Sequence, residues 1–222
     1  MVWPGTHTVV VPNPDLKPEK SLNYEAGSSF KADGVFGSDD HLFAKAVFFY
    51  DDVKDFIAPK AWFEPTTPPT VYYSSQNVGH VVRKGIELSG TYAAGQFSTS
   101  VSYGLLHAVD KETNERMNGI TPQSANLKLA YAFPAQAINV WYRAHWSKGG
   151  ESSVEDRATG KNLHFSSFLT HSLGAEWSPK VADLANLQAG IAVVNLFDKE
   201  YRMLNGSYGS GRGVRLWLSA QF

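Results

Sequence analysis

Residues 213–222 read GVRLWLSAQF, and apolar and polar side chains alternate along this stretch without interruption. One parity holds Val214, Leu216, Leu218, Ala220 and Phe222, and the other holds Arg215, Trp217, Ser219 and Gln221. Successive side chains of a β-strand point to opposite faces of its sheet. The pattern therefore predicts a strand with one apolar face and one largely polar face.

Eight further segments show the same period of two, so that the sequence predicts nine strands. They are centred near residues 20–31, 41–57, 71–93, 97–108, 123–133, 137–147, 165–177, 187–197 and 213–222. No long stretch keeps the 3.6-residue period of an amphipathic helix. These observations predict an all-β protein.

The connections between the predicted strands alternate in length along the chain. The short ones cover residues 34–40, 93–96, 134–136 and 178–186, and the long polar ones cover 58–70, 108–122, 147–162 and 198–213. An up-and-down antiparallel sheet with this alternation has all its short turns at one end, as transmembrane barrels do. A soluble β-sandwich or a lipocalin-like barrel also has alternating strands and remains the alternative at this point.

The composition excludes several classes of function. The 20 basic and 21 acidic residues nearly cancel, so no global field favours nucleic acid as a partner. Cysteine is absent, which excludes disulfides, thiolate metal sites and cysteine nucleophiles. The catalytic and nucleotide-binding motifs of common enzyme classes are also missing, which predicts that the protein is not an enzyme. We interpret the acidic group Asp51, Asp52 and Asp55 as a solvated strand end rather than a calcium or catalytic site.

Five segments, in order along the chain, resemble the TonB-dependent outer-membrane receptors. They are NPDLKPEKSLNYEAG (13–27), VFFYDDVKDFI (47–57), QNVGHVVRKGIELSG (76–90), NLFDKEYR (195–202) and GRGVRLWLSAQF (211–222). Two of them also predict local structure. Asn-Pro-Asp should form a turn at the start of the first segment, and Asn195 and Asp198 should accept backbone hydrogen bonds where a strand passes into its loop.

The resemblance implies an antiparallel up-and-down transmembrane β-barrel. This chain would supply about nine C-terminal strands of a 22-stranded plugged barrel, without the plug domain. Residues 1–20 would be the remainder of an extracellular loop that leads into the Asn-Pro-Asp-Leu box, residues 13–16. Residues 21–222 would be barrel strands with short periplasmic turns and long extracellular loops. The implied location is the bacterial outer membrane, with outer-membrane lipid around the barrel and lumen-facing polar residues, such as Arg143, packed against the plug.

The resemblance also implies a ligand site at His7. In haem and haemoprotein receptors of this family, a histidine in the loop before the box is an axial ligand of haem iron, and His7 stands six residues before Asn13. Neutral imidazole binds haem iron well, and Trp3 is a possible stacking contact for the porphyrin. A solvated loop histidine is the alternative for His7. The other six histidines lack the spacing of a zinc site and are assigned no ligand role.

The resemblance implies active transport of haem, captured from a haemoprotein or a hemophore. Haem would be the transported ligand and not a catalytic cofactor. The missing N-terminal part of the receptor would contact the TonB energy-transducing complex. A ferric siderophore receptor is the first alternative, and a passive porin or a structural β-barrel domain is a more distant one.

Overall fold

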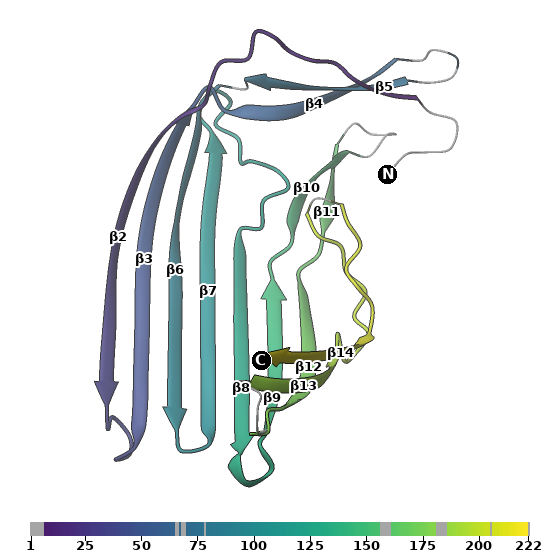
Figure 1. The fold of residues 1–222 in the computed structure, drawn as a ribbon. Coiled ribbons are helices and arrows are strands. Elements are labelled where there is room, and N and C mark those ends of the chain that lie inside the picture. Colours follow the sequence, from purple (N-terminus) through teal and green to yellow (C-terminus); the bar gives the residue numbers. More distant parts are fainter. Residues whose placement is uncertain are drawn as a thin grey trace. The chain divides into compact units, whose positions relative to one another are not determined.

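The computed structural model describes residues 7–64, 67, 70–77, 79–155, 161–180, 186–204 and 206–221. Its main element is a nine-stranded sheet in the order β14-β13-β12-β9-β8-β7-β6-β3-β2 (Figure 1). The strands are β2 (Lys20–Asp33), β3 (Asp40–Lys54), β6 (Val81–Ala94), β7 (Phe97–Asp110), β8 (Gln123–Phe133), β9 (Ile138–Ser147), β12 (Phe168–Trp177), β13 (Asn186–Val194) and β14 (Gly213–Gln221). The register between β7 and β14 is antiparallel throughout. The predicted nine-stranded antiparallel sheet is confirmed.

Five shorter strands lie where the sequence predicted loops or continuous strands. They are β1 (His7–Val10), β4 (Ile57–Glu64), β5 (Thr70–Asn77), β10 (Gly150–Glu155) and β11 (Asn162–Phe165). β1, β5 and β4 form a three-stranded sheet, and β10 pairs with β11. Two of the long connections, at residues 58–70 and 147–162, therefore contain strands of their own.

Four predicted strand bounds are wrong, and in three cases a backbone angle explains the break. The predicted strand 71–93 divides into β5 and β6 at Gly79, which has a φ of 88°. The predicted strand 41–57 ends at Lys54 because Asp55 has a φ of 55°, and 187–197 ends at Val194 because Asn195 has a φ of 48°. Positive φ lies outside the β region. The fourth strand, predicted from residue 165, begins at Phe168.

The short connections at residues 34–40, 93–96 and 134–136 form tight turns, as predicted, whereas part of the connection 178–186 lies outside the described residues. Between β2 and β3, the carboxylate of Asp40 accepts hydrogen bonds from the backbone N–H groups of Val35, Phe36 and Gly37 at 2.7, 2.7 and 2.9 Å. Between β8 and β9, the 3₁₀-helix η1 (Pro134–Gln136) ends on Ala137, whose φ is 54°. No helix in the described part of the chain is long and apolar enough to cross a membrane.

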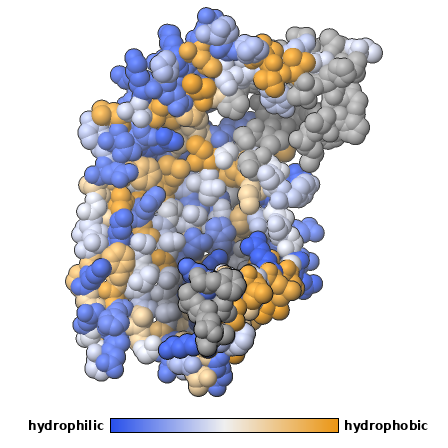
Figure 2. Space-filling view, viewed as in Figure 1, coloured by the Kyte–Doolittle hydropathy of each residue, from blue (hydrophilic) through white to orange (hydrophobic). Residues whose placement is uncertain are grey.

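The two faces of the sheet differ in polarity. One face exposes large apolar side chains from β2 to β14, including Leu22, Phe48, Leu88, Val101, Leu173, Ile191, Leu216 and Leu218. The opposite face carries the other parity, and Figure 2 shows mostly hydrophilic and near-neutral residues over the hollow of the sheet. An apolar face of this extent requires an apolar environment. This face therefore fits contact with lipid.

A small core lies on the polar face, over the C-terminal strands. It consists of Ala130, Trp141 and Ala192, with Trp217 packed against it. Trp141 pairs with Gly174, where a Cβ atom would lie 2.4 Å from the indole ring. Glycine therefore leaves the space that this indole fills, and the same holds for Gly190 beneath Trp217.

The chain divides into two compact units, which we name the loop unit and the barrel unit. The loop unit comprises Met1–Tyr24, Phe49–Lys84 and Ala108–Met117. The barrel unit comprises Glu25–Phe48, Gly85–His107 and Asn118–Phe222. Each unit holds one candidate site, and the two sites are described separately.

Candidate functional site

In the loop unit, His7 is the first residue of β1, an edge strand of the three-stranded sheet. β1 pairs in parallel with β5, with His7 opposite Thr70 and Val10 opposite Tyr73. The Val11 N–H continues this ladder by donating to the Tyr73 carbonyl at 2.8 Å. The structure thus fixes the backbone of His7 in a strand. Trp3 lies outside the described residues.

The Asn-Pro-Asp-Leu box is attached to the sheet that carries His7 by the side chain of Asn77. Asn77 Oδ1 accepts from the Lys17 N–H at 2.9 Å, and Nδ2 donates to the Lys17 carbonyl at 2.9 Å. Nδ2 also donates to the Asp55 carbonyl at 2.6 Å. One amide therefore joins Lys17, the residue that follows the box, to the end of β5 and to the turn after β3.

The predicted turn of the box is present at Pro14 and Asp15. The Asp15 N–H donates to Asn13 Oδ1 at 3.1 Å, and Asn13 Nδ2 donates to the Ser75 carbonyl at 3.0 Å. Further on, Glu19 Oε1 accepts from the Ile57 N–H at 2.6 Å. These bonds leave the segment between β1 and β2 little freedom.

The interpretation of Asp51, Asp52 and Asp55 as a solvated strand end is wrong for Asp51. Asp51 is 7% exposed, and its carboxylate accepts from Arg83 Nε at 2.9 Å and also from Nη2. The Asp52 carboxylate lies 2.7 Å from Nε2 of His80. Asp51 therefore joins β3 to Arg83 near the start of β6, and Asp52 joins β3 to His80, which directly precedes β6. Among the described residues, no group of three or more acidic or histidine side chains is placed to hold a metal ion.

Replacing Arg83 by methionine is expected to lower the free energy of local unfolding of the loop unit by about 2 kcal/mol. The substitution leaves the Asp51 carboxylate buried without its cation, although partial exposure of Arg83 reduces the effect. Hydrogen exchange of the β3 and β6 amides measures this free energy of local unfolding. Lys84→Met is the matched control, because Lys84 is exposed. Equal exchange rates in the two variants would contradict a stabilising role for the pair.

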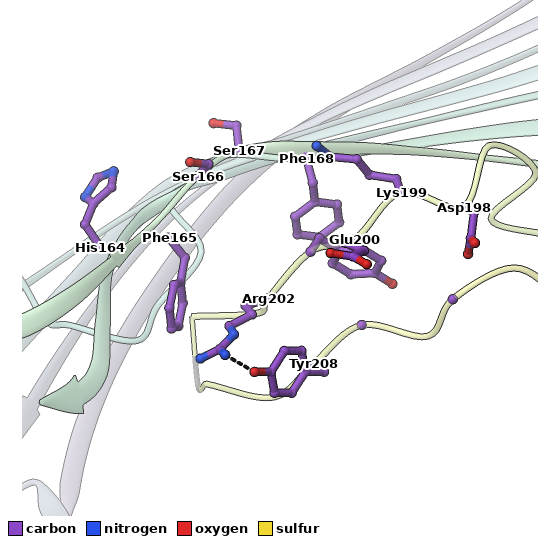
Figure 3. A pocket seen from close by; sticks show the side chains of 13 residues that line it. His164, Phe165, Ser166, Ser167, Phe168, Asp198, Lys199, Glu200, Arg202 and Tyr208 are labelled. Atoms are coloured by element: carbon purple, nitrogen blue, oxygen red, sulfur yellow. Dashed lines mark hydrogen bonds between the residues drawn. The ribbon is translucent and has the colours of Figure 1, made fainter. Parts of the chain in front are cut away.

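The barrel unit holds a cavity of about 720 Å³ beside the β13–β14 connection, residues 195–212. In Figure 3, the side chains of Phe165 and Phe168 lie on the side of the 164–168 backbone that faces Arg202. The side chains of His164 and Ser167 lie on its opposite side. The guanidinium carbon of Arg202 lies 5.6 Å from the Phe165 ring centroid and 4.0 Å from that of Tyr208. Arg202 also donates to the Tyr208 hydroxyl. The cation is therefore held between two aromatic rings.

The β13–β14 connection is held in place by Asn195, which is 5% exposed. Asn195 Oδ1 accepts from the Lys199 N–H, and Nδ2 donates to the carbonyls of Lys199 and Ser210, all at 2.9–3.0 Å. Asp198 Oδ1 accepts from the Arg212 N–H at 2.7 Å. The predicted acceptor roles of Asn195 and Asp198 are confirmed. They close this connection into a fixed loop.

A stack of side chains joins the loop to β12. The Tyr201 ring lies 4.1 Å from the Phe168 ring, at an interplanar angle of 28°. A Cβ atom on Gly209 would lie 2.1 Å from the Tyr201 ring, so only glycine fits there. His164 also lines the cavity, and its Nδ1 lies 3.0 Å from Glu151 Oε1. Sequence reasoning did not identify this cavity, because its walls come from distant segments.

Comparison with known proteins identifies the family of the chain. Residues 3–196 match the family model described as TonB dependent receptor-like, beta-barrel. The chain belongs to this family. Members are receptors of the bacterial outer membrane, which places the nine-stranded sheet there.

Relatives and solved structures agree with this assignment. The chain is 25% identical to heme/hemopexin utilization protein C of Haemophilus influenzae (strain 86-028NP), over 93% of this chain and 29% of the relative. It is 24% identical to a hemin receptor of Yersinia pestis, over 96% of this chain and 30% of the relative. The structure of the FrpB iron transporter from Neisseria meningitidis has the same fold, with a TM-score of 0.66 and 21% identity over 94% of this chain and 31% of that chain. The chain thus spans less than a third of the length of these proteins.

Proposed function

We propose that this chain forms the C-terminal barrel strands of a TonB-dependent receptor that imports haem across the outer membrane. The observation that carries the proposal is the similarity over nearly the whole chain to relatives named for haem or hemin. Residues 1–20 would then belong to an extracellular loop and residues 21–222 to barrel strands, within a 22-stranded barrel that contains a plug.

His7 is the ligand residue in this proposal. It would coordinate haem iron from the outer side, with Trp3 stacked on the porphyrin. The hydrogen bonds that join the box to β5 support this role, because they fix the strand on which His7 lies. A ligand residue whose backbone is already fixed in a strand loses less conformational freedom on binding, which lowers the entropic cost.

The transport cycle follows from the proposed family role. Outer loops take haem from a haemoprotein or hemophore, and the TonB complex acts on the plug to admit the ligand. The apolar face of the sheet contacts lipid, and the polar face packs against the plug. None of these steps requires a catalytic cofactor. Haem is cargo.

A ferric siderophore receptor is the second candidate. The cavity around Arg202 favours it, because a cation between aromatic rings also suits an anionic aromatic iron chelate. Growth separates the two functions. A strain without its own haem and siderophore receptors, carrying the complete receptor, should grow on haem as its iron source. Growth on ferric siderophores alone would contradict the proposal.

A further inference from the structure

A long groove crosses the apolar face of the barrel unit. Its volume is about 700 Å³, and it runs over the neighbouring strands β3, β6, β7, β8, β9 and β12. Adjacent strands lie about 4.8 Å apart, so the groove extends over about 24 Å. Large apolar side chains line it and remain 43–51% exposed, namely Leu88, Val101 and Leu169. A volume of this size, spread over that length, makes the groove narrow.

Small residues between these large side chains leave the groove open. They are Ala44, Gly90, Ala125 and Ala144. A Cβ atom on Gly90 would lie 3.5 Å from Val101 Cγ2, an ordinary contact, so the backbone does not require glycine there. In the part of the chain that the structure describes, no charged side chain lines the groove. A hydrocarbon chain fits such a lining, because a polar occupant would lose its hydrogen bonds to water.

The groove is continuous with the face that contacts lipid. The chain belongs to a family of outer-membrane receptors, and this face exposes large apolar side chains from β2 to β14. The hydrocarbon of the bilayer surrounds such a face in a transmembrane barrel. The membrane therefore supplies the occupant, which is an acyl chain of a lipid.

A polar pair lies beside the end of the groove that reaches β12. The Tyr142 hydroxyl lies 2.5 Å from Nδ1 of His171, and His171 is opposite Ala144 of the groove. Tyr142 is opposite Leu173, so the pair belongs to the apolar face. The Phe197 ring meets the imidazole edge to face, at 5.0 Å between centroids. Among the described residues, Tyr142 is the hydrogen-bond partner of this imidazole, and Nε2 remains for a hydroxyl, ester or amide of a lipid.

The other end of the groove, near the β2–β3 turn, lacks such a group. Tyr92 lines the groove there, and its hydroxyl donates to Asp40 Oδ2 at 3.1 Å. The Asp40 carboxylate is 1% exposed and already accepts three backbone N–H groups. A carboxylate also repels the phosphate of a lipid. The polar part of a bound lipid therefore fits the His171 end.

We propose that this groove holds one acyl chain of the glycolipid that forms the outer leaflet of the outer membrane, with His171 and Tyr142 bound to the polar group at the head of that chain. The inference rests on the orientation in the proposed function, with the long connections outside, but not on haem as the cargo. His171 is the fourth residue of β12, which follows the long connection 147–162, so in that orientation it lies toward the outer leaflet.

Lipid A, the acylated part of this glycolipid, tests the groove with the purified complete receptor in detergent. Native mass spectrometry counts the lipid molecules that stay bound. Ala144→Leu fills the groove beside His171 and should weaken lipid A binding about tenfold, the loss expected when about two methylene groups lose their contact. Ala175→Leu is the matched control, because Ala175 lies on the same face, opposite Ile191, and does not line the groove. Equal lipid A binding by the two variants would overturn the site.

Two further variants test the polar pair and the choice of leaflet. His171→Phe keeps a ring but removes its polar atoms, and it should weaken lipid A binding about fivefold. Unchanged binding would refute the role of the pair. Gly90→Leu fills the opposite end and should weaken lipid A binding less than Ala144→Leu does. If both leucine variants released phosphatidylethanolamine, a phospholipid, but kept lipid A, the proposed glycolipid would be wrong.

Haem binding separates this inference from the proposed function. All four variants should keep the haem affinity of the parent receptor, which shows that they are folded. A parent receptor that binds lipid A in the groove but no haem would refute only the proposed function. A parent receptor that binds haem but retains no lipid A would refute only this inference.

Discussion

Replacing His7 by alanine is expected to weaken haem binding by the complete receptor about a hundredfold, or about 2.7 kcal/mol. In the proposed site the substitution removes a direct bond to the iron, whereas the backbone of residue 7 is held in β1 by its pairing with β5. The three-stranded sheet β1-β5-β4 should therefore stay folded while the iron loses its histidine ligand. A Soret titration with ferric haem measures the affinity and reports the change of axial ligation in the same experiment.

Two controls make the His7 result specific. Thr8→Ala changes the next residue of the same strand, and His41→Ala removes a histidine that pairs with Asp33. Both should leave affinity and spectrum unchanged. The account of His7 would fail if His7→Ala also kept the wild-type spectrum.

Replacing Asn195 by alanine is expected to lower the free energy of local unfolding of the β13–β14 connection by about 3 kcal/mol. The change leaves the Lys199 N–H and the carbonyls of Lys199 and Ser210 without their partner in a partly buried setting. It also places alanine at a φ of 48°, a left-handed conformation that asparagine adopts more readily because its short polar side chain can hydrogen-bond locally. Hydrogen exchange of the Lys199 and Arg212 amides, or the rate of proteolytic cleavage within the loop, measures the effect.

Two further variants separate the contributions to the Asn195 effect. Asn195→Gly removes the hydrogen bonds but accepts the backbone angle, so it should show most of the loss. Asn114→Ala changes an exposed asparagine with a similar φ of 58° and should cost less than about 1 kcal/mol. If Asn195→Ala were no worse than Asn114→Ala, the hydrogen bonds of Asn195 would not stabilise the loop.

The main sheet was predictable because strand alternation is a local property of the sequence. Nine strands and their short turns follow from it, and the family assignment agrees. The strand breaks at Asp55 and Gly79 were missed because one residue with positive φ ends a strand without disturbing the alternation around it. β1 and β5 were missed for another reason. They pair in parallel across about 60 residues, and no local pattern marks such a partner.

Some residues of the candidate sites were likewise predictable from the sequence, and others were not. His7 was found through its spacing from a motif, and Asn195 and Asp198 through their position at a strand end. The pairing of Asp51 with Arg83 was missed, because the two residues meet only through the packing of β3 and β6. The cavity that His145 and Arg202 line was missed because its walls come from β8, β9 and the β13–β14 connection. Their positions depend on strand register and on the loop that Asn195 holds in place. Alternation did place His145 on the polar face beside Arg143, which was the available signal.

The most direct test of haem import is a titration of the purified complete receptor with ferric haem, followed by its Soret band. The account predicts saturable binding with a dissociation constant of about 1 μM or tighter, and a spectrum typical of histidine-ligated iron. A receptor that gives no saturable change with haem, but binds a ferric siderophore under the same conditions, would contradict it.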